Sequence, residues 1–275
     1  MGSINEEVFD ALIYWIVERQ DILFAKKRGV EAPWSSNKVM QQTYFCNVRR
    51  EEDKVTAGIR RLWNNRQEPC QAAPNMIMAR MVNKVESLEA MGWPWAEFNL
   101  DRWTEVMSQK GSWGGAYIVS TNGRSMPKHE YIGELLSGVW EAFKAITLPN
   151  TLGQAHKRLI AIQGLGSFMA AQVVADLKNT PDHTLQTAED WSSWCAHGPG
   201  SLRGMAWLLK QEKCTPTRFY AEMPNLRELV DERLEHPYGD FCNQDLQNCL
   251  CEFDKFMRVT NNTGRSKRKY NGGGS

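Results

Sequence analysis

The sequence contains no long hydrophobic run. None of its apolar stretches approaches the roughly 20 residues that a helix needs to cross a bilayer. The first residues, 1–7, lack the basic and apolar regions of a signal peptide, and the acidic residues that follow Gly2 disfavour myristoylation. We therefore expect a cytoplasmic protein with no membrane partner.

Cysteine is neither paired nor arranged for metal binding. Seven cysteines, an odd number in a chain of this size, favour reduced thiols over a disulfide framework. Cys249-Leu250-Cys251 lacks the Cys-x-x-Cys spacing of a zinc site, and the five histidines are scattered along the chain. We expect no metal site.

An excess of charge of one sign is also absent, since 33 Lys and Arg against 32 Asp and Glu give a net charge of +1. Local basic patches nevertheless matter more for nucleic-acid binding than the sum. Such clusters occur at 26–28, 49–50, 60–61, 157–158 and 265–269. Each is either part of a nucleic-acid surface or a solvated helix face, and the sequence leaves both interpretations open.

What the chain does contain is helical periodicity, which predicts a mainly α fold. One face of the first helix carries Val8, Leu12, Trp15, Ile16, Arg19 and Leu23. Further helices are expected from Ser36 or Asn37 and over 51–63, 76–91, 95–110, 129–146, 156–162, 167–177, 202–213, 225–234 and 243–257. Residues 116–120 are the one candidate strand. No repeat or internal linker divides the chain, so we expect a single compact body with two intertwined lobes over 1–260 and a flexible basic, glycine-rich tail over 261–275.

The most informative local pattern, within 157–178, is a pair of helices joined by a tight turn. Gly164 and Gly166 in this turn permit left-handed backbone angles and close approach. The amides of Ser167 and Phe168 begin the second helix and would face an anion, for which a DNA phosphate is the natural candidate. The pattern indicates a helix-hairpin-helix that grips a DNA backbone. A plain helix corner with glycine caps is the alternative.

Five segments, taken together, carry a resemblance to a known family. They are Arg19 to Asp53, Arg80 with Asn83, the hairpin with Gln172 and Asp176, Gly198-Pro199-Gly200-Ser201 with Arg203-Gly204, and Gln247 to Lys255. In this order they resemble the alpha-glutamyl/putrescinyl thymine pyrophosphorylases, the amino acid:DNA transferases of phages that hypermodify thymine. That family is similar to helix-hairpin-helix DNA glycosylases, which implies a two-lobed helical fold that holds a flipped base.

The resemblance also implies a reaction. The enzyme would be a transferase that replaces the phosphate or pyrophosphate of activated 5-hydroxymethyluracil in DNA with an amine. The amine donor would be glycine, serine, glutamate or putrescine, the functional partner a 5-hydroxymethyluracil DNA kinase, and the location the host cytoplasm. No cofactor is expected. Base flipping or single-stranded DNA is required because a stacked base hides its 5-substituent, and the product would protect phage DNA from restriction.

A departing phosphate needs cations and backbone amides. Guanidinium groups match phosphate oxygens well, and a Gly-Pro-Gly loop that opens a helix offers amides to the same anion. We assign this role to Arg49, Arg50, Gly198, Gly200, Ser201 and Arg203. Ion pairs with neighbouring carboxylates are the alternative for the arginines.

An attacking amine must lose a proton, so the reaction needs a general base. Asp190 is the first candidate, because it lies near the position at which helix-hairpin-helix glycosylases keep their catalytic aspartate; a helix cap is its alternative. Glu252 is the second candidate, because it lies on an otherwise apolar helix where burial would tune its pKa. An ion pair with Lys255 is its alternative.

Amide and aromatic side chains supply the remaining contacts of the predicted site. An amide offers both a donor and an acceptor to a base edge or to a carboxylate. We assign base or amino-acid binding to Tyr44, Asn47, Arg80, Asn83 and Asn248, with helix capping as the alternative for the asparagines.

Two other functions fit the same pattern. One is a true DNA glycosylase, although the lysine that such an enzyme places after the hairpin is missing here. The other is a non-catalytic DNA-binding subunit of a modification complex, which would use only the hairpin and the basic patches.

Overall fold

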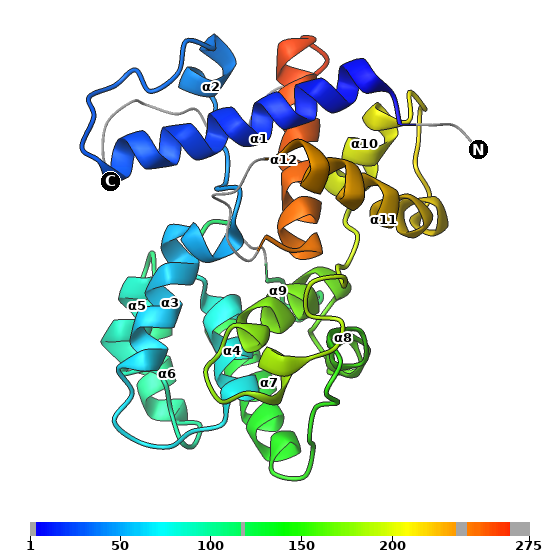
Figure 1. The fold of residues 1–275 in the computed structure, drawn as a ribbon. Coiled ribbons are helices and arrows are strands. Elements are labelled where there is room, and N and C mark those ends of the chain that lie inside the picture. The colour runs from blue at the N-terminus through cyan, green and yellow to red at the C-terminus, as the bar shows by residue number, and fades with distance from the viewer. Residues whose placement is uncertain (1–3, 117–118, 235–240, 265–275) are drawn as a thin grey trace. The chain divides into compact units, whose positions relative to one another are not determined.

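The computed structural model describes residues 4–116, 119–234 and 241–264. These ranges contain twelve α-helices, two short 3-10 helices and no strand (Figure 1). The predicted mainly α fold is therefore confirmed. The glycosylase-like architecture that the resemblance implies stays a prediction.

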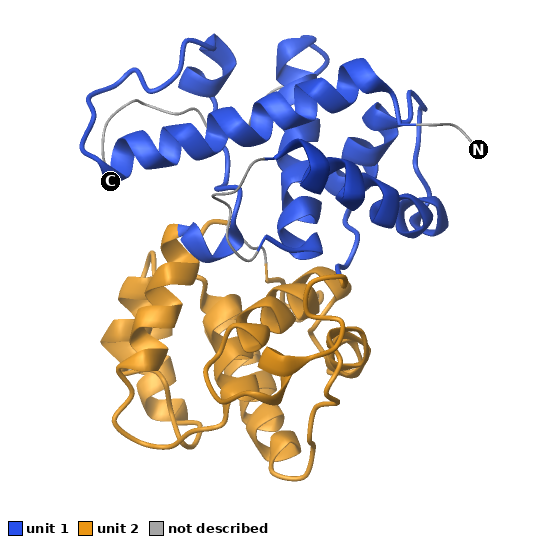
Figure 2. Ribbon diagram, in the orientation of Figure 1, with its two compact units in different colours: residues 1–53, 195–275 blue, residues 54–194 orange. Residues whose placement is uncertain are grey.

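The chain divides into two compact units (Figure 2). Unit 1 is built from the two ends of the chain, Met1–Asp53 and Cys195–Ser275, and unit 2 is the continuous segment Lys54–Trp194. The helices of unit 1 are α1 (Glu6–Lys27), α2 (Lys38–Gln42), η1 (Arg50–Glu52), α10 (Pro199–Leu208), α11 (Pro216–Arg233) and α12 (Asn243–Thr260). Those of unit 2 are α3 (Lys54–Asn64), α4 (Ala72–Val82), α5 (Val85–Met91), α6 (Leu100–Met107), α7 (Lys128–Phe143), α8 (Leu152–Ile160), α9 (Ser167–Lys178) and η2 (Thr184–Thr187).

Each unit has its own hydrophobic core. In unit 1 the apolar faces of α1 and α12 meet, with Leu12, Trp15 and Phe253 fully buried. In unit 2 the core includes Met76 of α4 and Val173 of α9. The two clusters share no residue, so the boundary between the cores coincides with the boundary between the units.

Helix starts follow local capping chemistry. The side chains of Asn5, Asn37 and Thr215 accept hydrogen bonds from first-turn amides of α1, α2 and α11. Such caps satisfy amides that have no intrahelical partner, and each stabilises its helix by about 1 kcal/mol. These polar side chains explain why the observed starts of α1 and α2 agree with the periodicity.

Several predicted elements differ from the observed ones. The single helix predicted over 76–91 is two helices, because Asn83 adopts a left-handed conformation with φ 48° and ends α4. The α11 helix begins at Pro216, nine residues before its predicted start at 225, because a proline fits the first turn of a helix. No described residue of 116–120 forms a strand, and residues 117–118 lie outside the described ranges. The predicted tail beyond residue 264 lies outside them as well.

The predicted turn between two helices is present between α8 and α9. Gly164 has φ +86°, and a Cβ there would lie 2.3 Å from a methyl carbon of Leu135, so this position requires glycine. The expectation for Gly166 was wrong, because this residue is extended, with φ −79° and ψ 167°, and serves as the N-cap of α9.

Two glycines let α10 and α12 approach closely in unit 1. A Cβ at Gly200 would lie 2.2 Å from Sγ of Cys251, and a Cβ at Gly204 would lie 2.2 Å from the backbone oxygen of Leu250. A side chain at Gly204 would push the helices apart, and one at Gly200 would displace the side chain of Cys251. Helix packing therefore accounts for the spacing of these two glycines.

None of the described helices combines the length and the apolar character that crossing a membrane requires. Within the described ranges, no group of three or more His, Cys, Asp or Glu side chains could hold a metal ion. All seven cysteines are free thiols.

Candidate functional site

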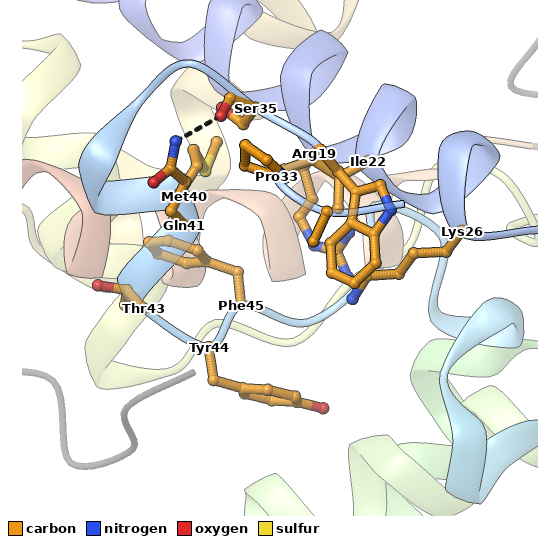
Figure 3. A pocket seen from close by; sticks show the side chains of 12 residues that line it. Arg19, Ile22, Lys26, Pro33, Ser35, Met40, Gln41, Thr43, Tyr44 and Phe45 are labelled. Atoms are coloured by element: carbon orange, nitrogen blue, oxygen red, sulfur yellow. Dashed lines mark hydrogen bonds between the residues drawn. The ribbon is translucent and has the colours of Figure 1, made fainter. Parts of the chain in front are cut away.

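Unit 1 contains a pocket of about 350 Å³ beside α1 (Figure 3). Its volume lies within the range of about 300–1,000 Å³ that small-molecule sites occupy. Apolar and aromatic side chains form most of its wall, with a few polar groups among them, as is typical of ligand sites. The lining residues on α1 are Arg19, Ile22 and Lys26. Those on the loop before α2, on α2 and directly after it are Ala32, Pro33, Trp34, Ser35, Met40, Gln41, Thr43, Tyr44 and Phe45.

Arg19 is the central charged residue of this pocket. It lies on the apolar face of α1 and is only 9% exposed. Its Nε donates to the backbone oxygen of Cys46 at 3.0 Å, and its Nη2 donates to Oδ1 of Asn47 at 2.5 Å. Its Nη1 is buried and has no hydrogen-bond partner among the described residues. A buried donor without an acceptor is costly, so an acceptor that reached Nη1 would offset that cost.

Glu252 of α12 connects this C-terminal helix to the segment around Cys46, next to the pocket wall. Its Oε2 accepts hydrogen bonds from the backbone amide of Cys46 at 3.1 Å and from Nζ of Lys255 at 2.5 Å. Nζ of Lys255 also donates to the backbone oxygen of Tyr44 at 3.1 Å. The ion pair with Lys255 that the sequence offered as an alternative is therefore present, and it helps to hold the segment that lines the pocket.

Asp53 is a second carboxylate close enough to Arg19 and Glu252 to interact with them electrostatically. Its Oδ1 accepts a hydrogen bond from the backbone amide of Asn47 at 3.0 Å. Burial raises the pKa of Asp53 to about 6, against the lowering effects of that hydrogen bond and of Arg50 and Arg19. A carboxylate with this pKa exchanges protons close to neutral pH, which is what a general base requires.

The cysteines near Glu252 lie in surroundings that favour the protonated thiol. Burial, followed by the charge of Glu252, raises the pKa of Cys46 well above its usual value. The same two causes raise the pKa of Cys251 to about 11. Only a thiolate is a good nucleophile, so these raised pKa values disfavour both thiols as nucleophiles at neutral pH.

Three of the residues predicted to bind the base or the amino acid lie close to Arg19 or to the pocket wall: Asn47, Asn248 and Tyr44. Asn47 uses its side chain to accept from Arg19 and to donate to the backbone oxygen of Glu52 at 2.7 Å. Asn248 donates to the backbone oxygen of Asn47 at 3.2 Å. Both amides therefore connect protein segments to one another. Tyr44, which is 41% exposed, lies on the pocket wall and is the predicted contact residue that faces outward.

The residues predicted for phosphate binding do not line this pocket. Nε of Arg203 donates to Oδ2 of Asp254 at 2.9 Å, while about half of the arginine side chain stays exposed. Oγ of Ser201 bonds both backbone groups of Gly198, which closes the first turn of α10. The backbone amide of Arg50 donates to Asp245 at 2.9 Å. Arg49 is half-buried. The phosphate role of these residues and of Gly200 stays a prediction.

Two predicted site residues, Arg80 and Asn83, lie in unit 2. Nε and Nη2 of Arg80 each donate to a different oxygen of Asp176 at 2.5 Å, and both side chains are almost completely buried. This bidentate pair joins α4 to α9. Asn83 caps the end of α4 and is also buried. Both positions favour structural roles over contact with a base.

Asp190 and the hairpin also belong to unit 2. The two carboxylate oxygens of Asp190 accept from the amides of Leu152 and Gly153, at 2.7 and 2.9 Å. The side chain thus caps α8, the first helix of the hairpin. In the second helix, Ser167 is exposed and Phe168 is 56% exposed, so the hairpin tip faces outward as backbone binding would require.

Sequence reasoning missed Arg19 and Asp53 as site residues. The available signal was an arginine on the apolar face of the first helix, where an unpaired cation is costly. The residues around Asp53 offered no comparable signal, since its burial arises only when α1, η1 and α12 come together.

The described part of unit 1 thus forms a helical module with a mostly apolar pocket, whose wall includes the charged residues Arg19 and Lys26. The chain belongs to the family described as the helical domain of 5-hmdU DNA kinase, whose profile matches residues 6–266. A curated relative, the 5-hmdU DNA kinase of Bacillus phage SP10, is 22% identical over 288 aligned residues. The alignment covers 92% of this chain and 45% of the relative, so the chain spans about half of the relative's length. No solved structure matches the chain.

Proposed function

We propose that this chain modifies 5-hydroxymethyluracil in phage DNA, and that it transfers the amine of a small donor onto the base after a kinase has activated it. The reaction would take place in the host cytoplasm, with DNA as the substrate and a 5-hydroxymethyluracil DNA kinase as the functional partner.

The family supports the substrate. The relative is named a 5-hmdU DNA kinase, and the matching profile describes the helical domain of such kinases. The printed sequence contains no Gly-Lys pair and therefore no G-x-x-x-x-G-K-[ST] loop, the element with which P-loop kinases bind nucleotide phosphates. This supports a step other than P-loop phosphoryl transfer for these 275 residues.

The observation that carries the proposal is Arg19, a mostly buried arginine that lines a pocket with aromatic sides and whose Nη1 has no described partner. A guanidinium with one free edge matches a carboxylate or a phosphate oxygen. Tyr44, which lines the pocket and is 41% exposed, offers a ring face to a planar group. The pocket therefore suits both a charged donor and a flipped pyrimidine.

The chemistry requires one base and one leaving group. The donor nitrogen attacks the 5-methylene carbon of the activated base, a C–N bond forms, and the C–O bond to the phosphate or pyrophosphate breaks. The electron pair of that bond leaves with the phosphate oxygen. The amine proton passes to a carboxylate, which we assign to Asp53 next to Glu252, because both oxygens of Asp190 already accept backbone amides.

Nucleoside mass spectrometry tests this function. The protein is incubated with 5-hydroxymethyluracil DNA, a 5-hydroxymethyluracil DNA kinase, ATP and one donor at a time from glycine, serine, glutamate and putrescine. A nucleoside heavier by the mass of the donor minus water is expected, and its formation should require ATP. Release of free base would instead identify a glycosylase. Unchanged nucleosides with every donor would leave only a DNA-binding role.

A further inference from the structure

We propose that unit 2 binds a second nucleobase of the DNA strand, one that is not itself modified, in a small pocket beside the turn of the hairpin. This pocket is separate from the one that Arg19 lines. The protein would therefore contact an unpaired base at a position other than the modified one. The inference rests on the proposed function only for the choice of DNA as the ligand.

The pocket has a volume of about 210 Å³ and lies among the hairpin turn, the start of α9, α7 and the loop before α7. Sites for drug-sized ligands occupy about 300–1,000 Å³, so this smaller pocket suits a group the size of one base. Gly164 and Gly166 of the turn belong to its wall. No atom lies within 4 Å of the place that a Cβ on Gly166 would take, so this part of the wall borders open space.

Three hydrogen-bonded side chains form the polar side of the pocket. Nδ2 of Asn122 donates to the hydroxyl oxygen of Tyr131 at 2.7 Å, and Oγ of Ser120 donates to Oδ1 of Asn122 at 3.2 Å. Tyr131 is only 3% exposed, and its own hydroxyl proton has no acceptor among the described residues. An acceptor that reached this hydroxyl would offset the cost of a buried, unused donor. The edges of nucleobases carry such acceptors as ring nitrogens and carbonyl oxygens.

Apolar side chains form the rest of the wall. Ile132, Leu135 and Met169 contribute aliphatic surface, and Phe168, which is 56% exposed, contributes part of an aromatic ring. A base has apolar faces and a polar edge, so it matches a pocket that is polar on one side and apolar on the others. A free phosphate would leave this apolar surface uncovered and would bury charge against carbon.

The charge near the hairpin favours a nucleic-acid strand over a neutral ring compound. Lys157 and Arg158, in the last turn of α8, are exposed and pair with no carboxylate of the described residues. A phosphate at the amides of Ser167 and Phe168, the position predicted for the DNA backbone, would bring its attached base close to this pocket, because Phe168 belongs to both. A base that is stacked and paired in a duplex cannot enter, so the bound base must be unpaired.

An abasic scan tests the inference by binding alone. Fluorescence anisotropy measures the affinity of the protein for single-stranded oligonucleotides that contain one 5-hydroxymethyluracil, in which one other nucleotide at a time is replaced by an abasic tetrahydrofuran residue. The backbone charge stays the same, so only base contacts change. At one position besides the modified one, the replacement should weaken binding at least about fivefold. Equal affinity for every abasic position would overturn the inference.

Matched variants locate the contact in this pocket. Ser120→Leu fills the pocket from an exposed position and should remove the abasic penalty, whereas Ser125→Leu, at an exposed position outside the wall, should keep it. Asn122→Gly removes the amide and tolerates the φ of 51° at this position, so it should also reduce the penalty. Its control is Asn262→Gly, at an exposed position of unit 1 with φ 54°. A wild-type penalty in Ser120→Leu protein that circular dichroism shows to be folded would overturn the assignment to this pocket.

The inference and the function can fail separately. If mass spectrometry detects transfer but no unmodified position shows an abasic penalty, the function stands and the second base site is wrong. If Ser120→Leu removes a penalty that the wild type shows but no nucleoside gains mass, the base site stands and the transfer is wrong.

Discussion

At the scale of single residues, the chemistry of the site depends on groups that burial changes. Asp53 is the clearest case, because desolvation raises its pKa from 3.8 to about 6. The folded protein therefore binds this proton more tightly than the unfolded chain does. Between about pH 4 and 6 stability consequently falls as the pH rises, and the total effect is at most about 3 kcal/mol.

Asp53→Asn should remove this pH dependence. The amide keeps an acceptor for the Asn47 backbone but cannot ionise, so the variant should lose less stability than wild type between pH 4 and 7 in urea unfolding curves.

If Asp53 is the base, wild-type transfer should decline below about pH 6 as the carboxylate becomes protonated. The variant should lose most activity at every pH. A variant with the wild-type pH profile would contradict the assignment.

Asp190 allows a direct comparison between a structural and a catalytic carboxylate. Because both of its oxygens accept backbone amides of α8, Asp190→Ala should lower the free energy of unfolding by about 1–2 kcal/mol. Asp190→Asn keeps one oxygen acceptor and should recover part of that loss. Activity that follows stability in the two variants would support the capping role, whereas a stable but inactive Asp190→Asn protein would restore Asp190 as the base.

At the scale of helices, close contacts decide which small residues are required. The pair α10 and α12 is held together at Gly200 and Gly204, where a Cβ would meet Cys251 or the backbone of Leu250. The pair α4 and α9 is held by the buried Arg80–Asp176 bridge. Motifs that are separate in the sequence therefore become partners across helix pairs.

Gly204→Ala should destabilise the protein by about 1–3 kcal/mol, because the added methyl group would lie 2.2 Å from a backbone oxygen that cannot move away on its own. The control is Gly138→Ala in α7, an exposed position with no atom within 4 Å of the new Cβ. There the gain in helix propensity should stabilise the protein by up to about 1 kcal/mol. Thermal unfolding measures both, and equal midpoints would argue against the close approach of α10 and α12.

At the scale of the whole molecule, the two cores suggest two cooperative units. Unit 1 joins the ends of the chain around one core, and unit 2 folds around another. The proposed donor site lies entirely in unit 1, and the hairpin lies entirely in unit 2. Under the proposed function, donor binding would belong to unit 1 and binding of the DNA backbone to unit 2.

Core substitutions should affect these units separately. Leu12→Ala in unit 1 and Leu136→Ala in unit 2 each remove a fully buried side chain and should cost about 2–5 kcal/mol. In hydrogen exchange, Leu12→Ala should lower protection chiefly in 4–53 and 195–264, and Leu136→Ala chiefly in 54–194. A uniform loss of protection in both variants would indicate a single cooperative unit.

The sequence by itself determined the helical class, the hairpin and most helix positions. These depend on local properties: the 3.6-residue period, capping side chains such as Asn5 and Asn37, and a turn glycine at 164. It failed at Asn83, which ends α4 in a left-handed conformation and so divides a continuous apolar pattern into two helices, because the apolar period was weighed above the known preference of asparagine for such helix ends.

The tertiary structure decided which residues share a site. Glu252 meets the amide of Cys46 across 206 positions of sequence, and Arg80 meets Asp176 across 96. Pairings at such distances depend on which helix faces pack together, and no local pattern records them. The arginine on the apolar face of the first helix was visible in the sequence. The hydrogen bonds of its Nε and Nη2, and the pocket that it lines, exist only in the folded chain.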